Sequence, residues 1–154
     1  MKLTKNLSLQ EMLKSRTATR LGLSNSPSEE HVKNMQALAE NIFQPLRDYF
    51  GVPIYISSGY RSEALNKAIG GSKSSQHCKG EAMDIDRDGY SQPDNAQIFE
   101  YIKKNLDFDQ IIWEFGTQKN PEWVHVSHKR DGKNRAELLV AYKTSYGKTK
   151  YRQF

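Results

Sequence analysis

The stretch Ser75–Asp86, with the sequence SQHCKGEAMDID, places an imidazole, His77, and a carboxylate, Asp84, seven positions apart. Gly80 lies between them and lets the chain turn sharply before a short strand. Side chains alternate along a strand, so Asp84 lies on one face and its two apolar neighbours on the other. A carboxylate on a partly buried strand needs a partner for its charge. A metal ion also bound by His77 would be that partner, because His and Asp are both zinc ligands.

A zinc site needs a third protein ligand, and His125 is the candidate. It sits between two valines in the segment 122–128, which is expected to form a strand. Cys78 directly follows His77, but adjacent side chains point apart, so its expected role is packing. Without a third ligand the stretch would be an ordinary loop followed by a capped strand. Spacing alone leaves both interpretations open.

The composition describes one domain, because 154 residues with 36% hydrophobic and 27% charged residues can bury a single core. No apolar run approaches the roughly 18 residues that span a bilayer, so no transmembrane segment is expected. The first residues have no apolar segment after their lysines, which predicts synthesis in the cytoplasm without a signal peptide. The single cysteine excludes an internal disulfide. The net charge of +5 favours anionic partners but does not choose among nucleic acid, lipid and wall polymer.

Apolar periodicity predicts both helices and strands. Residues 26–29 (SPSE) have the pattern of a helix start, with Ser26 as the cap and Glu29 closing a capping box. An apolar stripe at helical spacing follows as far as Tyr49, and Pro45 is expected to kink this helix. The further expected elements are a helix over 97–106 and strands over 52–58, 81–86, 110–115, 122–128 and 138–142.

These elements predict an α+β fold with a central, mainly antiparallel sheet and helices packed on one side. The Asp131-Gly132 turn suggests that the strand 122–128 pairs antiparallel with the strand 138–142. The core is expected over about residues 7–142. Residues 143–154 are basic and aromatic, and we interpret them as a solvated tail without assigned chemistry.

Two charged residues stand out for their surroundings. Glu114 lies inside an apolar run, and such surroundings raise the pKa of a carboxylate, which suits a general acid or base. Arg61 lies between the strand expected over 52–58 and a short helix expected to extend to Ile69. Such a junction is a common place for a ligand-binding side chain. On local sequence alone, the favoured interpretation of Arg61 is a surface arginine paired with a nearby glutamate.

Taken together, these residues resemble the zinc peptidases of the M15 family. This family includes D-alanyl-D-alanine carboxypeptidases, VanX-type dipeptidases and several phage endolysins, and the Hedgehog signalling domain shares its fold. The likeness extends from about Leu7 to Tyr142. Its matching pieces, in the order of the family, are Ser57-Ser58-Gly59-Tyr60-Arg61-Ser62, Ser75-x-His77-x-x-Gly80-x-Ala82-x-Asp84-Ile85, Trp113-Glu114 and Trp123-Val124-His125-Val126-Ser127.

The resemblance implies a role for each matching residue. His77, Asp84 and His125 would bind Zn²⁺ and leave one coordination position for water, as catalytic zinc sites do. Arg61 would bind a carboxylate of the substrate, a task suited to a bidentate guanidinium. Ser75 would donate a hydrogen bond to the substrate.

Two carboxylates compete for the role of general base. Glu122, three residues before His125, matches the Glu-x-x-His pattern of the VanX-type enzymes. Glu114 matches the position seen in Hedgehog domains and in phage-like members of the family. Strand alternation puts Glu122 on the face opposite His125, so Glu114 is the preferred candidate.

The implied substrates are the D-amino-acid-containing stem peptides of peptidoglycan, cleaved by a monomeric carboxypeptidase or endolysin-like enzyme that acts on the bacterial cell wall. A non-catalytic zinc-binding module like the Hedgehog domain is the alternative. Nucleic-acid binding rests on the net charge alone and is not expected. The sequence does not decide which peptidoglycan bond is cut.

Overall fold

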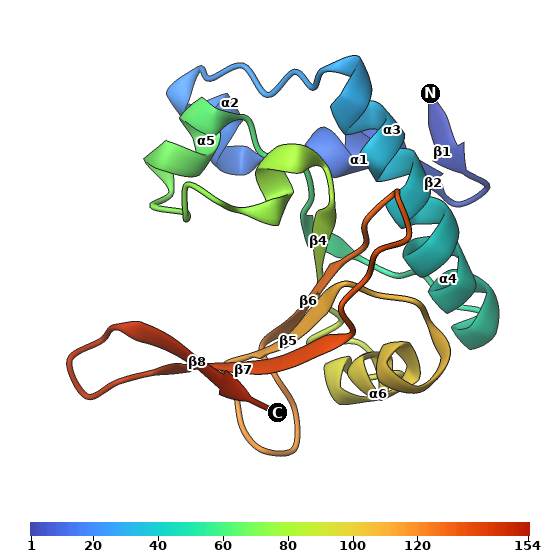
Figure 1. Cartoon of the computed structure of the whole chain (residues 1–154), viewed down its shortest axis with the longest axis vertical. Helices are drawn as coiled ribbons and strands as arrows, with labels where there is room; N and C mark the ends of the chain where they lie inside the picture. The colour runs from blue at the N-terminus through green and yellow to red at the C-terminus, as the bar shows by residue number, and fades with distance from the viewer.

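In the computed structural model, which describes residues 1–154, a six-stranded sheet runs through the middle of the molecule (Figure 1). Its strands, in spatial order, are β3 (Ile56–Ser58), β4 (Ala82–Ile85), β6 (Trp123–Ser127), β5 (Gln110–Glu114), β7 (Glu137–Lys143) and β8 (Thr149–Gln153). A separate small sheet pairs β1 (Lys2–Thr4) with β2 (Leu7–Ser8). The fold is therefore α+β with a mostly antiparallel sheet, as predicted.

The helical elements precede or interrupt the strands of the sheet. They are α1 (Leu9–Leu13), α2 (Arg16–Leu21), α3 (Glu29–Leu38), the π-helical turn η1 (Ala39–Phe43), α4 (Gln44–Phe50), α5 (Glu63–Ala68), the 3-10 turn η2 (Gln76–Lys79) and α6 (Asn95–Asn105). None of these helices is long and apolar enough to cross a membrane.

The long N-terminal helix starts two residues later than the sequence suggests. Ser28, not Ser26, caps α3: its hydroxyl accepts from the His31 N–H, and the His31 ring accepts from the Ser28 N–H. His31 occupies the third helical position, where this reciprocal partner is needed. The predicted capping box between Ser26 and Glu29 is therefore wrong.

Directly before Pro45, the same helix contains a wider, π-helical turn. The π-helical turn η1 lies directly before Gln44 and Pro45, and the helix then continues as α4. A proline has no N–H for the helical hydrogen-bond ladder, and a locally wider turn accommodates its ring. Gly51, in the left-handed region with φ +67°, ends α4.

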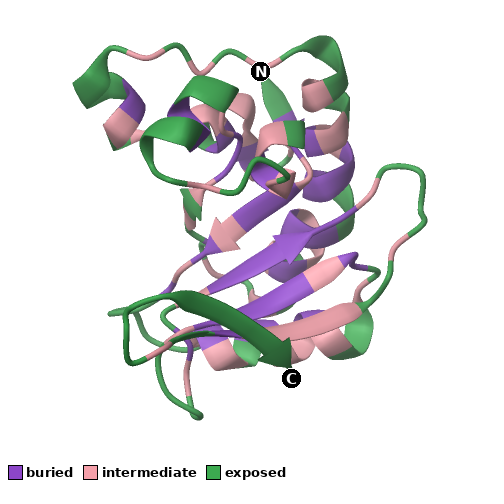
Figure 2. Cartoon of the chain, turned by 60° about the vertical axis from the view of Figure 1, so that its left-hand side comes forward, coloured by how far each residue is buried: buried purple, intermediate pink, exposed green.

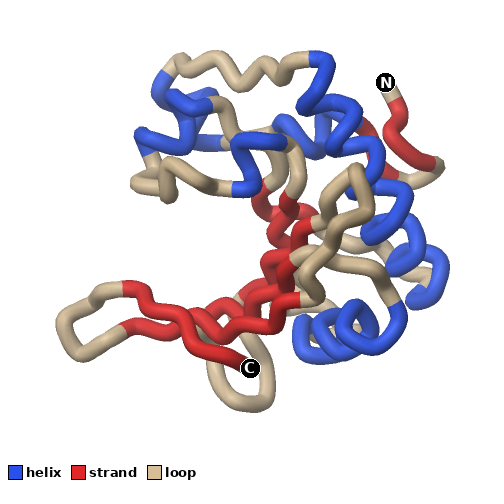
Figure 3. Tube along the Cα trace, viewed as in Figure 1, coloured by secondary structure: helices blue, strands red, loops and turns tan.

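The hydrophobic core lies between one face of the sheet and the helices α3, α4 and α6 (Figures 2 and 3). The sheet contributes the fully buried Met83, Ile85, Ile111, Val124 and Val126. Side chains on the neighbouring positions of these strands point to the other face. That second face carries the candidate functional residues.

One predicted strand pairing is wrong. β6 pairs with β4 and β5, whereas β7 pairs with β5 in the parallel sense, so the strand 122–128 does not contact the strand 138–142 as a hairpin. The intervening loop turns at Gly132 and is then held at the start of β5, where Arg135 binds Asp109 and the Glu137 N–H donates to the Asp109 carbonyl. β7 therefore begins beside Gln110 and runs along the outer side of β5.

The predicted C-terminal tail is a strand. β8 pairs antiparallel with β7 from Leu139↔Gln153 to Lys143↔Thr149, and the resulting hairpin projects from the body of the molecule (Figure 1). Its end returns to the core, where the Phe154 ring lies 4.8 Å from that of Phe99 between ring centroids. Backbone pairing, not burial, holds β8, because all its residues are exposed.

Candidate active site

His77 lies on η2, a single turn that leads into β4. Ser75 caps this turn, its hydroxyl accepting from the His77 N–H at 3.3 Å, and Gly80 ends it with φ +74°. His77 is 2% exposed, and its ring Nδ1–H donates to the Gly59 carbonyl at 2.8 Å. Because a carbonyl only accepts, the ring proton is on Nδ1, and the Nε2 lone pair is free to bind a ligand.

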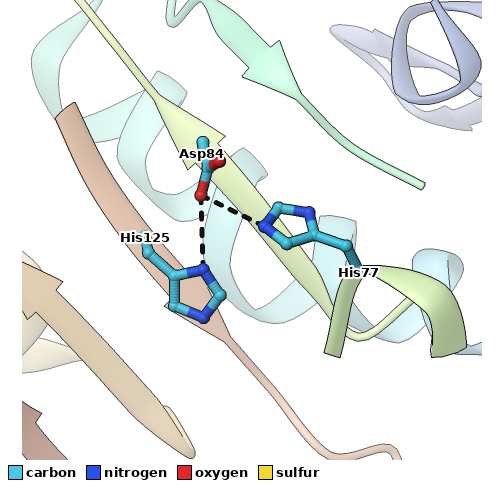
Figure 4. A group of neighbouring side chains, drawn as sticks. All are labelled: His77, Asp84 and His125. Atoms are coloured by element: carbon cyan, nitrogen blue, oxygen red, sulfur yellow. Dashed lines mark hydrogen bonds and ion pairs between the residues drawn. The ribbon is translucent and has the colours of Figure 1, made fainter. Parts of the chain in front are cut away.

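Asp84 and His125 are neighbours across β4 and β6, which pair with these two residues directly opposite each other. One carboxylate oxygen of Asp84 lies 3.2 Å from His77 Nε2 and 3.2 Å from His125 Nδ1 (Figure 4). Burial alone would raise the pKa of Asp84, but the two imidazoles outweigh it and hold that pKa well below its usual range. The carboxylate is therefore held in its ionised form.

The orientation of the His125 ring is set by Gln76, the first residue of η2. The buried Asp109 accepts a hydrogen bond from Gln76 Nε2 at 3.0 Å and two more from the Arg135 guanidinium, at 3.0 and 2.8 Å. The Gln76 amide oxygen therefore faces His125 Nε2, at 2.8 Å. The ring proton of His125 is then on Nε2, which leaves its Nδ1 lone pair facing inward.

His77, Asp84 and His125, called the metal triad from here on, thus direct two ring nitrogens and one carboxylate oxygen at one point. Their ligand atoms lie within 4.8 Å of one another. The outer nitrogen of each ring has its own hydrogen-bond acceptor, so the inner nitrogen can bind a metal ion in place of a proton. Two imidazole nitrogens and one carboxylate oxygen form a donor set of catalytic zinc sites. The residues therefore fit a metal ion, and the structure brings together the three ligands that the sequence indicated.

The role of Gln76 in orienting His125 is not predicted from the sequence. Gln76 is adjacent to a predicted ligand, and this proximity is the one local signal that could have singled it out. Asp109 and Arg135 lie far along the chain, and nothing in their own surroundings points to the site. Cys78 lies outside the metal triad and is half-buried, and burial raises the pKa of its thiol.

Glu114 ends β5 on the face of the sheet that carries the metal triad, because Ile112, two residues earlier, pairs with His125. Glu114 is only 8% exposed. Burial raises the pKa of its carboxyl group to about 7, the charge of Asp84 adds to the effect, and His125 and Arg61 oppose it. A carboxylate that titrates near neutrality can both take and return a proton.

Glu122, the competing carboxylate, lies elsewhere. Its side chain is exposed, and it is not among the residues that line the cleft around the metal triad. Its backbone N–H donates to the Glu114 carbonyl at 2.9 Å, immediately before β6 begins. Of the two candidates, the structure places only Glu114 in the cleft.

Arg61 also lines the cleft, where its guanidinium lies 3.4 Å from the Ser75 hydroxyl. No carboxylate lies within ion-pair distance of it, and its Nε is buried without a hydrogen-bond partner. The interpretation favoured by the local sequence, a surface arginine paired with a glutamate, is therefore wrong. A cation with an unsatisfied buried donor favours the binding of an anionic ligand.

These residues share one open cleft of about 720 Å³. The loop 70–75 contributes one side of the cleft, and the β7–β8 hairpin contributes another. The lining also includes three cationic and three aromatic side chains: Arg61, Arg135, Lys143, Phe115, Trp123 and Tyr151.

A metal triad with room for a further ligand, beside a carboxylate whose pKa is near 7, defines a metal-dependent hydrolase. The comparison with known families gives this class a narrower identity. Residues 5–127 match the family described as Peptidase M15, and the chain belongs to this family of metallopeptidases. No curated protein matches the chain. The matched residues include the metal triad, Arg61, Ser75, Glu114 and Glu122, and they end before β7.

Proposed function

We propose that the protein is a zinc-dependent peptidase that cleaves the D-amino-acid-containing stem peptides of peptidoglycan, as a carboxypeptidase or as an endolysin-like endopeptidase. The observation that carries this proposal is the position of Glu114, a carboxyl group with a pKa near 7 in the same cleft as the metal triad. The nitrogen-rich donor set supports zinc over magnesium or calcium, which prefer oxygen ligands. When bound, zinc polarises the peptide carbonyl and acidifies water.

The chain supplies the proton transfers and the binding of the substrate. Glu114 takes the proton of the attacking water and passes it to the leaving amine, because it is a buried carboxyl group in the same cleft as the metal triad. Arg61 binds a carboxylate of the peptide, because its guanidinium faces the cleft without an acidic partner. Ser75, 3.4 Å from Arg61, holds the substrate by a hydrogen bond.

Peptidoglycan is the proposed polymer because its stem peptides carry carboxylates and the cleft is cationic. The chain as a whole is also basic, with a net charge of +5, which favours an anionic wall polymer. We therefore propose that a monomer acts on the bacterial cell wall.

Mass spectrometry of fragments released from defined muropeptides tests the proposal and identifies the bond that is cut. We expect cleavage with zinc, its loss after chelation and its return when zinc is added. Glu114→Gln should keep zinc bound but lose at least 100-fold in turnover, as expected for a general base, whereas the exposed Glu122→Gln should retain it. If Glu122→Gln lost turnover and Glu114→Gln did not, Glu122 would be the general base.

The same experiment distinguishes the non-catalytic alternative. A Hedgehog-like binding module would be stabilised by zinc and would release no fragment from any muropeptide. The raised pKa of Glu114 and the unpaired guanidinium of Arg61 oppose this alternative, because a purely structural metal site needs neither.

A further inference from the structure

The β7–β8 hairpin lies beyond the residues that match the family and forms one side of the cleft. Four of its residues line the cleft that contains the metal triad: Leu139, Lys143, Thr149 and Tyr151. The hairpin extends away from the body of the molecule (Figures 1 and 3). Lys143, Thr149 and Tyr151 are exposed, so a bound peptide can reach them.

Strand register fixes which side of the hairpin faces the cleft. Glu114 pairs with Ala141 across β5 and β7, and Ala141 pairs with Tyr151 across β7 and β8, so these three side chains form a row on one face. The small side chain of Ala141 leaves room for Tyr151 beside Glu114. Tyr151 is 54% exposed, and the partial burial of its hydroxyl on the cleft side raises the pKa of that hydroxyl, with the charges of Glu114 and Asp84 adding to the effect.

Lys143 brings a positive charge to this row. It lies two residues after Ala141 on the same face and pairs with Thr149, whose hydroxyl accepts a hydrogen bond from Nζ at 2.9 Å. Nζ also lies 5.2 Å from the centroid of the Phe115 ring, which helps to hold the ammonium in place. No carboxylate lies within ion-pair distance of Nζ.

The cleft thus contains two cations without an acidic partner, Arg61 and Lys143, whereas Arg135 is paired with Asp109. Arg61 follows β3, at one edge of the sheet, and Lys143 ends β7, near the other edge. The strands β4, β6 and β5, with the metal triad and Glu114, lie between them.

We propose that the hairpin is part of the substrate-binding site, in which Lys143 binds an acidic group of the peptide on the side of the scissile bond opposite to the group bound by Arg61. The inference rests on the proposed peptidase function and extends it: the preferred substrate carries carboxylates on both sides of the bond that is cut. Tyr151 packs against the peptide between Lys143 and Glu114.

Binding of two synthetic stem pentapeptides tests this inference. One carries the free α-carboxylate of its D-glutamate, the other carries a carboxamide there, and both keep the terminal carboxylate. Fluorescence anisotropy gives their dissociation constants in the zinc-loaded Glu114→Gln background, in which bound peptide stays intact. Lys143→Gln is compared with Lys150→Gln, which removes the same charge from the opposite face of the hairpin, where Lys150 pairs with Tyr142.

We expect Lys143→Gln to weaken binding of the acidic peptide about 5-fold, the size typical of a solvent-accessible ion pair. The affinity for the carboxamide peptide should change less than 2-fold, and Lys150→Gln should leave both affinities unchanged. Equal losses for both peptides, or equal effects of the two lysine variants, would overturn the inference. If no protein bound either peptide, the proposed function itself would fail, and this inference with it.

Discussion

Glu114→Gln is predicted to stabilise the metal-free protein above neutral pH. The carboxyl group of a glutamate ordinarily has a pKa of 4.5, and in the fold burial raises the pKa of Glu114 to about 7. The difference between these two values corresponds to about 3 kcal/mol of free energy. Glu114 is 8% exposed, so solvent screening does little to reduce this figure.

Proton binding sets the direction of the effect. Between pH 4.5 and about 7, the folded chain holds a proton at Glu114 that the unfolded chain has released. The free energy of unfolding therefore falls as the pH rises through this window, by up to about 3 kcal/mol. A glutamine is neutral at every pH and does not incur this cost. We expect the variant and the native protein to be similar near pH 4.5, and the variant to be about 3 kcal/mol more stable at pH 8.5.

Urea denaturation of the chelator-treated proteins at both pH values measures these free energies. For a chain of 154 residues, the gain at pH 8.5 corresponds to a rise in melting temperature of roughly 6–12 °C. Glu122→Gln is the matched control, because an exposed carboxylate should give no pH-dependent difference. A gain of equal size at both pH values, or none at pH 8.5, would show that Glu114 does not have a raised pKa.

Three further substitutions address other parts of the site. Gln76→Ala should weaken zinc binding 10- to 100-fold, as loss of a partner that orients a ligand does, and an unchanged dissociation constant in chelator competition would exclude a role in holding His125. Arg61→Lys should raise KM about 10-fold with little change in kcat, because it loses bidentate binding; a fall in kcat alone would contradict this. Gly80→Ala should lose roughly 1–3 kcal/mol of stability and bind zinc more weakly, because its Cβ would meet a backbone carbonyl of α3 at 2.5 Å. Gly70→Ala, with similar φ but open space, is its control, and equal thermal shifts in the two variants would exclude this clash as the cause.

Local patterns were sufficient to predict the faces of the strands. Alternation along 81–86 put Met83 and Ile85 in the core and Asp84 on the other face, and the structure has this arrangement. The apolar run around Glu114 predicted a raised pKa, which burial does produce. Both properties depend on immediate neighbours in the sequence, so no knowledge of strand order was needed.

Features that depend on strand order were not predictable from local sequence. The turn at Gly132 is typical of a hairpin between 122–128 and 138–142. Hydrogen bonds to Asp109 instead hold the intervening loop at the start of β5, so β7 pairs with β5. β8 has no apolar alternation, because all of its residues are exposed and backbone hydrogen bonds alone define it. Its contribution to the cleft therefore left no signal in the composition of 143–154.

The turn that precedes β4 explains why one short stretch determines so much of the site. Ser75 contacts Arg61, Gln76 orients the ring of His125, and His77 is itself a ligand, so three consecutive residues reach three different parts of the cleft. Gly80 closes this turn at a position where a Cβ would collide with α3. A shift of the turn would therefore disturb the ligand, the orientation of its partner and the anion-binding arginine together. Because these contacts share one rigid turn, metal binding and substrate binding should be lost together when the turn is displaced.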